Sequence, residues 1–248
     1  MQDLSLSSVN QAAAGKIRPF FQDLIAKYAS NIHSLYVTGT ALNQDYNEKK
    51  SDINSIIVLK KMDLKFLEFL APLGKKYKKQ TVSAPLIMTP EYITTSLDVF
   101  PIEFLNFKLL HTAVYGENIL ENLQLTNNDL RHQCERELKV KLIWLRQGYL
   151  SSMGDRKALN EAFVSSITNY IPLFRGIIML LGEEPPVRQA DVISTLGKKT
   201  NTDTGIFERL LREKHGKASL SIEELNSMFE DYYAATERLV GIVDGINE

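Results

Sequence analysis

One stretch near the N-terminus decides the fold of this chain: Leu35–Leu59, LYVTGTALNQDYNEKKSDINSIIVL. Two short runs rich in Val, Ile and Tyr stand at its two ends, and such runs predict β-strands. Gly39-Thr40 follows the first run, and a polar loop leads from there to the second run. Ile57–Leu59 is apolar without alternation, which is typical of a strand covered on both faces. The stretch therefore predicts two strands of a sheet, the second of them central.

Two polar residues stand where the second strand begins. Successive side chains on a strand alternate between its faces, so Asp52 and Asn54 are predicted to project to the same side. Gly39-Thr40 is a turn of small residues, and glycine allows the backbone to approach a ligand closely. The pattern therefore predicts a polar pair at the mouth of a buried strand, opposite a turn that could approach a phosphate.

These residues, taken together, resemble the signature of the DNA polymerase beta-like nucleotidyltransferase superfamily. The usual signature begins with an apolar residue, which is followed by Gly and then by Ser or Thr. After a spacer comes Asp-x-Asp or Asp-x-Glu, which leads into an apolar strand. A third carboxylate lies on a later strand. The resemblance covers the first half of the chain, where the matching residues are Gly39-Thr40 and Asp52-Ile53-Asn54. The chain departs from the pattern at Asn54, where the family has its second acid.

The resemblance implies a role for each matching residue. Gly39 and Thr40 match the turn that contacts the phosphates, so they are the nucleotide-binding residues. Asp52 matches the first metal ligand and is a catalytic residue. Asn54 takes the place of the second metal ligand, but it brings an amide oxygen without a charge. In this chemistry, Mg²⁺ ions clamp the triphosphate and stabilise the attacking and leaving oxygens.

The third acid of the family is sought further along the chain. Phe100–Lys108 is predicted to be a strand. Glu103 stands between Ile102 and Phe104, so its side chain is predicted to project to the face opposite these two apolar residues. We therefore choose Glu103 as the third metal ligand and second catalytic acid, which places it on a strand adjacent to the others. Asp98, just before this run, is the alternative that the sequence leaves open.

The first half combines helices with strands. Helical spacing of apolar residues predicts helices over residues 8–28 and 63–73, and a third helix is predicted from Pro90 to Leu97. A weak strand is predicted over residues 82–88. These elements predict a mixed sheet flanked by helices. We assign residues 1–120 to a nucleotidyltransferase-like α/β domain.

The second half is predicted to be all-α, because no strand pattern follows residue 108. One stripe at helical spacing predicts a long helix, and its members are Leu130, Cys134, Leu138, Leu142, Leu145 and Tyr149. Further helices are predicted over residues 156–181, with a kink at Pro172, and over residues 187–196 and 205–214. The Ser221–Glu224 capping box predicts the start of the last helix. Residues 121–248 are therefore assigned to a helical-bundle domain, and the fold class is α+β. An α/β half followed by a helical bundle resembles the kanamycin-type bacterial nucleotidyltransferases.

Composition limits the environment and the partners. The formal net charge of −1 argues against bulk nucleic-acid binding. The single cysteine, Cys134, excludes an internal disulfide framework. The most apolar stretch, residues 163–181, is interrupted by Asn169, Pro172 and Arg175, so it does not predict a membrane span. No signal segment is visible, and we expect a cytoplasmic protein without membrane partners.

Two functional hypotheses follow, and Asn54 separates them. The first is an enzyme that transfers a nucleoside monophosphate from a nucleoside triphosphate to a small-molecule or protein acceptor with magnesium. Its activity would be weakened or lost because the second carboxylate is missing. The second is a non-catalytic member of the superfamily that acts as a nucleotide-binding, regulatory or interaction module. The sequence leaves open the acceptor, the base and the oligomeric state, a homodimer included.

Overall fold

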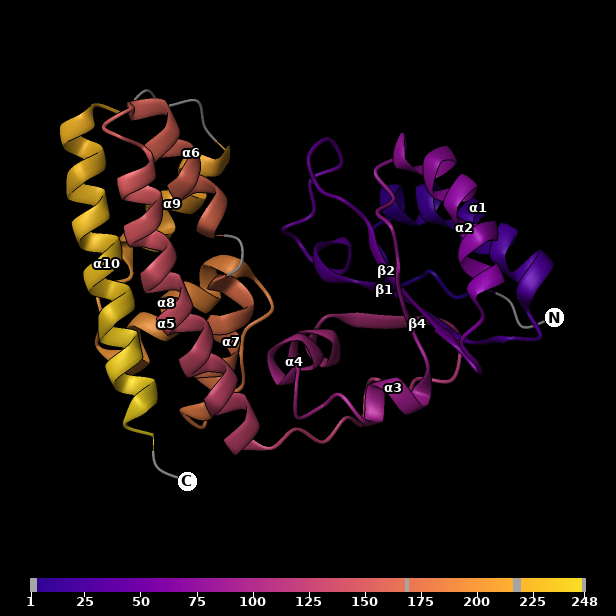
Figure 1. Ribbon diagram of the computed structural model, residues 1–248. Coiled ribbons are helices and arrows are strands. Elements are labelled where there is room, and N and C mark those ends of the chain that lie inside the picture. Colours follow the sequence, from indigo (N-terminus) through magenta and orange to yellow (C-terminus); the bar gives the residue numbers. More distant parts are fainter. Residues whose placement is uncertain (1–3, 168–169, 216–219, 247–248) are drawn as a thin grey trace. The chain divides into compact units, whose positions relative to one another are not determined.

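The computed structural model describes residues 4–167, 170–215 and 220–246 (Figure 1). The chain forms two compact units, which are described separately. The sheet unit consists of Met1–Asp98 and Glu103–Gln124. The helical unit consists of Val99–Ile102 and Leu125–Glu248.

The sheet unit is built on a four-stranded mixed sheet in the order β3-β2-β1-β4. Strand β1 (Ile32–Thr38) is antiparallel to both of its neighbours, β2 (Asn54–Leu59) and β4 (His111–Gly116). The edge strand β3 (Leu86–Met88) is parallel to β2. Ile56–Leu59 is fully buried in β2, because this strand has a neighbour on each side and apolar cover on its faces. The predicted central strand is therefore confirmed.

Two helices cover one face of this sheet, α1 (Gln11–Tyr28) and α2 (Leu64–Lys78). They lie side by side in Figure 1 and share one apolar core with the sheet. The core includes Ile17, Phe21, Leu35, Val37, Ile57 and Leu59. Helix α2 continues past the predicted end near Gly74. Its last turn is fixed by the buried Tyr77, whose hydroxyl donates a hydrogen bond of 2.7 Å to Asp23.

The predicted strand over Phe100–Lys108 is wrong, because this segment forms the helix α4 (Pro101–Leu109). Ile102, Phe104 and Leu105 are buried while Glu103 is exposed, which is a helical and not an alternating pattern. Proline is favourable at the first position of a helix, because the N–H it lacks would have no partner there.

The prediction that no strand follows residue 108 is also wrong. Strand β4 begins directly after α4 and pairs with β1 along its length. The predicted strand over residues 82–88 is shorter than expected, since only β3 is regular and Val82 makes a single bridge to Ile53. The short helix α3 (Pro90–Thr94) begins at Pro90 as predicted, and the Thr89 hydroxyl caps it.

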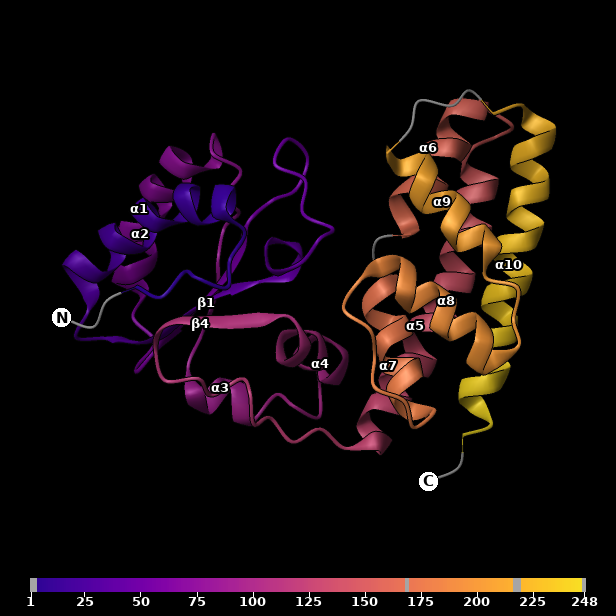
Figure 2. The same cartoon turned by 180° about the vertical axis from the view of Figure 1, so that it is seen from behind.

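After Gln124, all the regular elements among the described residues of the helical unit are helices, joined by turns and loops. Helices α5 (Asn127–Ser151) and α10 (Ile222–Asp244) lie side by side in both Figure 1 and Figure 2. The predicted stripe of α5 is confirmed for Leu130, Cys134, Leu138, Leu142 and Leu145, whose side chains are buried, while Tyr149 is only partly buried. Helix α5 packs against α7 and α10.

The predicted long helix over residues 156–181 is two helices, α6 (Arg156–Ser166) and α7 (Tyr170–Leu180). Pro172 does not kink a helix interior, because it lies in the first turn of α7, where the backbone N–H has no helical partner. No helix of the described residues, α7 included, is both long and apolar enough to cross a membrane.

The last helices of the unit follow at short intervals. Helix α8 (Gln189–Thr200) passes the predicted end at Gly197 and stops at Asn201, whose φ of 48° is left-handed. Asparagine tolerates this conformation at a helix end. Helix α9 (Gly205–His215) begins where it is predicted to begin.

The capping box at the start of α10 is a further prediction that the structure confirms, and it can be tested. The Glu224 amide donates to the Ser221 hydroxyl at 3.2 Å, and the Ser221 amide donates to the Glu224 carboxylate at 2.7 Å. We expect Ser221→Ala to lower the free energy of unfolding by about 1 kcal/mol, measured by urea denaturation. Ser221→Thr keeps a capping hydroxyl and should keep most of this stability, so an equal loss in both variants would contradict the capping role.

Candidate functional site

The first part of the candidate site is the turn after β1. Gly39 begins a short 3₁₀ helix, η1 (Gly39–Leu42), and has a φ of 77°, a conformation that favours glycine. The Gly39 amide donates to the Leu110 carbonyl at 3.0 Å, so the fold already uses this N–H. The Thr40 hydroxyl makes no hydrogen bond within the described residues. Thr40 is therefore the polar group of this turn that is available to a ligand.

The second part is the start of β2. Asp52 and Asn54 are exposed, while Ile53 between them and Ser55 after them are buried. The Ile53 amide donates to the Thr81 carbonyl at 2.8 Å, and the Ile53 carbonyl accepts from the Ser83 amide at 3.1 Å. This pairing holds Ile53 in extended conformation. Asp52 and Asn54 consequently share the solvent-facing side, as the sequence predicts.

The two parts adjoin one another. Asn54 lies opposite Thr38 in the β1–β2 pairing, and a Cβ atom placed on Gly39 would lie 3.6 Å from Nδ2 of Asn54. Within the part of the chain that the structure describes, Asp52 and Asn54, like Thr40, have no side-chain hydrogen bond or ion pair. Thr40 in the turn and Asn54 beside it are therefore not engaged by other described side chains, and Asp52 lies two residues from Asn54 on the same face.

The third acid does not lie where the sequence analysis places it. Glu103 is exposed in the first turn of α4 and not on a strand. Asp98, the alternative, lies in a turn after α3. The strand on the other side of β1 is β4, and its first residue, His111, is the one opposite Thr38. The alternation argument for Glu103 therefore no longer holds, because it depended on a strand.

His111 is the residue of this sheet edge that sequence reasoning missed. Its Nδ1 donates to the Phe107 carbonyl at 2.8 Å, and its Nε2 pairs with the Asn118 side-chain amide at 2.8 Å. The Asn118 amide nitrogen in turn donates to Glu121 at 3.0 Å. The ring is therefore held by partners at both nitrogens. No signal in the sequence connects His111 with Thr38, since the connection depends on the pairing of β1 with β4.

The donor groups at the site limit the metal that they could hold. Asp52 offers one carboxylate and Asn54 one neutral amide oxygen. Among the described residues, no three His, Cys, Asp or Glu side chains are grouped so that they could hold a metal ion. Magnesium commonly binds proteins through one or two carboxylates together with substrate phosphates. The donor groups therefore suit one magnesium ion that arrives with a triphosphate, and they do not suit two.

Comparison with solved structures shows a fold similar to that of a nucleotidyltransferase, in agreement with the fold that the resemblance in the sequence implies. The chain is similar to spectinomycin adenyltransferase AAD(9) from Enterococcus faecialis, whose crystal structure was determined with ATP and spectinomycin. The TM-score is 0.54 at 14% sequence identity, and the match covers 91% of this chain and 98% of that chain. At this identity the similarity concerns the fold alone.

A second solved structure is less similar. It is a nucleotidyltransferase-like protein from Exiguobacterium sibiricum 255-15, with a TM-score of 0.38 at 12% identity. That match covers 92% of this chain and 74% of that chain. No protein-family model matches the sequence, and neither does any curated protein.

Proposed function

We propose that this chain binds a nucleoside triphosphate together with one magnesium ion at the Gly39 turn, and transfers the nucleoside monophosphate to a small-molecule or protein acceptor. The observation that carries the proposal is the position of Asn54 beside the Gly39 turn, where two neighbouring strands meet, with Asp52 exposed on the same face as Asn54. The AAD(9) structure, which has a similar fold, contains ATP.

Each residue of the proposed site has one task. The Thr40 hydroxyl donates to a phosphate oxygen, while Gly39 keeps the turn free of a side chain. The Asp52 carboxylate and the Asn54 amide oxygen bind the magnesium ion. When bound, magnesium neutralises phosphate charge and orients the triphosphate. Glu103 is left out of the proposed site, because it lies on α4 and not on the sheet.

A second function, nucleotide binding without transfer, is favoured by the loss of acid groups. Asn54 stands where the family has a carboxylate, and the strand beside β1 presents His111 at this edge. Each missing carboxylate weakens the attraction for a divalent cation. A chain with such a site would act as a regulatory or interaction module.

The nucleotide proposal predicts a magnesium-dependent thermal shift. A ligand at about a hundred times its dissociation constant adds roughly 2.7 kcal/mol to the stability of the folded state. We expect ATP with magnesium to raise the melting temperature. At millimolar nucleotide, the corresponding gain in stability should be smaller than about 2.7 kcal/mol, because a carboxylate is missing at Asn54. Asn54→Asp is nearly isosteric and adds the missing charge, so it should enlarge the shift. Asp52→Ala should abolish it.

Glu68→Ala is the matched control, because Glu68 is an exposed acid of the same unit on α2. It should leave the shift unchanged.

A transfer assay with labelled ATP and a panel of acceptors then separates the two functions. Labelling that requires Asp52 supports the enzyme, and binding without labelling supports the module. Equal melting of the wild type, Asn54→Asp and Asp52→Ala with and without nucleotide would contradict both.

A further inference from the structure

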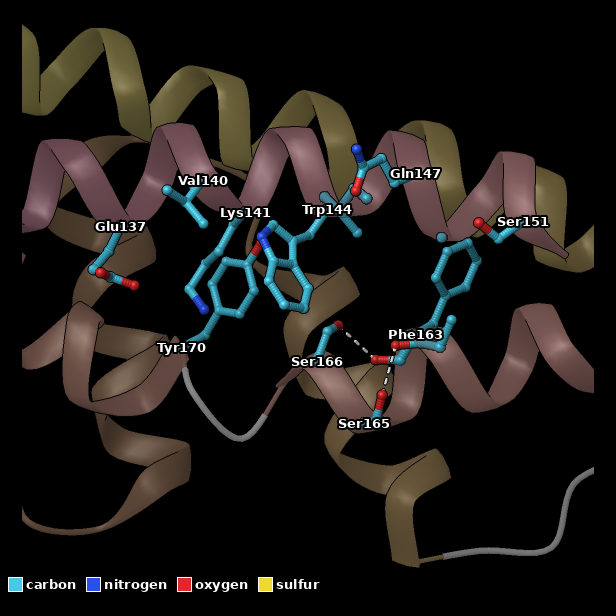
Figure 3. A pocket seen from close by; sticks show the side chains of 13 residues that line it. Glu137, Val140, Lys141, Trp144, Gln147, Ser151, Phe163, Ser165, Ser166 and Tyr170 are labelled. Carbon is cyan, nitrogen blue, oxygen red and sulfur yellow. Dashed lines mark hydrogen bonds between the residues drawn. The ribbon is translucent and has the colours of Figure 1, made fainter.

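The helical unit contains a cavity of about 450 Å³ that is lined by α5, α6 and α7 (Figure 3). This volume is within the usual range of small-molecule sites. Three aromatic side chains contribute to its wall: Trp144 from α5, Phe163 from α6 and Tyr170 from α7. The cavity lies wholly within the helical unit and shares no residue with the nucleotide site proposed above. It therefore requires an explanation of its own.

One cation is directed into this cavity. The Lys141 ammonium lies over the Tyr170 ring, with Nζ 4.3 Å from the ring centroid. Burial lowers the pKa of Lys141, an effect that the nearby Glu137 carboxylate opposes. Lys141 forms no ion pair or hydrogen bond among the described residues. Glu137 is already paired with Arg136 at 3.0 Å. The ammonium is thus partly desolvated, and no described residue accepts a hydrogen bond from it.

The structure shows no hydrogen bond between Lys141 and a hydroxyl group of the wall among the described residues. The Ser165 hydroxyl donates to the Ala162 carbonyl at 3.0 Å, and the Ser166 hydroxyl donates to the Phe163 carbonyl at 2.7 Å. Both bonds stay within α6 and are drawn in Figure 3. A ligand with an acceptor group would therefore meet Lys141 as the charged donor of the cavity.

We propose that this cavity binds a small organic anion with a flat apolar body. Its carboxylate or phosphate group accepts hydrogen bonds from Lys141, and its ring packs against Trp144 and Tyr170. An anion restores the interactions that the ammonium loses on burial, and hydrogen bonds between charged groups are the strong ones. Flat rings pack favourably on aromatic side chains. This site is independent of nucleotide binding, so its test does not depend on the function proposed for Asp52.

The sequence provides a fluorescent reporter at this site. Trp144 is the single tryptophan of the chain and is 71% exposed beside the cavity. We would titrate the protein with 4-nitrobenzoate, 4-nitrophenyl phosphate and the neutral 4-nitrobenzamide, which are flat quenchers of tryptophan fluorescence. Saturable quenching is expected for at least one anion, and the amide should bind about tenfold more weakly. The two anions distinguish a carboxylate ligand from a phosphate ligand.

Substitutions of Lys141 test its role. Lys141→Met should weaken binding of the anion about tenfold and remove the preference over the amide, while Lys141→Arg should keep it. Lys139→Met on the same helix is the control, because Lys139 is exposed and lies outside the cavity. Linear quenching that is equal for anion and amide in the wild type would overturn the proposal. An undiminished preference in a folded Lys141→Met protein would do so as well, since Lys141 would then only stabilise the bundle.

Discussion

A Gly116→Ala variant should lose about 4 kcal/mol or more of its unfolding free energy. The added methyl group would overlap backbone atoms, which cannot move aside as a flexible side chain can. Gly116 ends β4 with a φ of 78° and lies opposite Ser34 of β1. A Cβ atom at this position would lie 2.0 Å from the His33 carbonyl oxygen and 2.8 Å from Cα of Ser34. These are backbone atoms of β1, which has a neighbouring strand on each side. Moving them apart would disturb the pairing of β1 with β4 at this end of the strand.

Gly154→Ala is the matched control for this prediction. Gly154 also has a φ of 78°, but a Cβ atom there would have no neighbour within 4 Å. This variant should lose only the cost of the left-handed conformation, about 1–2 kcal/mol. Urea denaturation followed by circular dichroism measures both losses, and their difference isolates the overlap at β1. Similar losses in the two variants would show that the close approach of β4 to β1 is not rigid.

The start of the sheet could be predicted because its signals are local. The sequence of β2 contains an uninterrupted run of four apolar residues, Ile56–Leu59. Just before this run, Asp52 and Asn54 flank Ile53. Alternation along a strand then fixes the face of each side chain, whatever the rest of the chain does. The structure agrees with the sequence analysis on the shared face of Asp52 and Asn54 and on the turn at Gly39, while the roles of these residues stay predictions.

The segment around Glu103 could not be assigned in the same way. Short apolar runs fit a strand and a buried helix equally well, and only tertiary contacts decide between them. Here the neighbouring Ile102 amide donates at 2.7 Å to Gln133 of α5, a residue distant in sequence. Buried side chains on one side then complete the helical face of α4. The error in secondary structure caused the error in the third acid, because the choice of Glu103 relied on alternation.

Strand β4 was not predicted from the sequence, and the reason is different. It lies at an edge of the sheet, and Val114 is its one buried residue. An edge strand with so little apolar surface has a weak sequence pattern. The position of His111 beside Thr38 follows from the pairing of strands that are far apart along the chain. Single-sequence reasoning has no access to such pairing.

Leu138→Ala should remove about 2–5 kcal/mol from the stability of the helical unit, because it leaves a cavity in a closely packed core. Leu138 is fully buried at the middle of α5, where this helix packs against α7 and α10. Ile143→Ala is the control on the same helix. It truncates an aliphatic side chain that is 46% exposed, so the loss should be within about 0.5 kcal/mol. Urea denaturation followed by Trp144 fluorescence reports on α5 directly. Equal losses for the two variants would mean that the buried stripe of α5 does not stabilise the bundle.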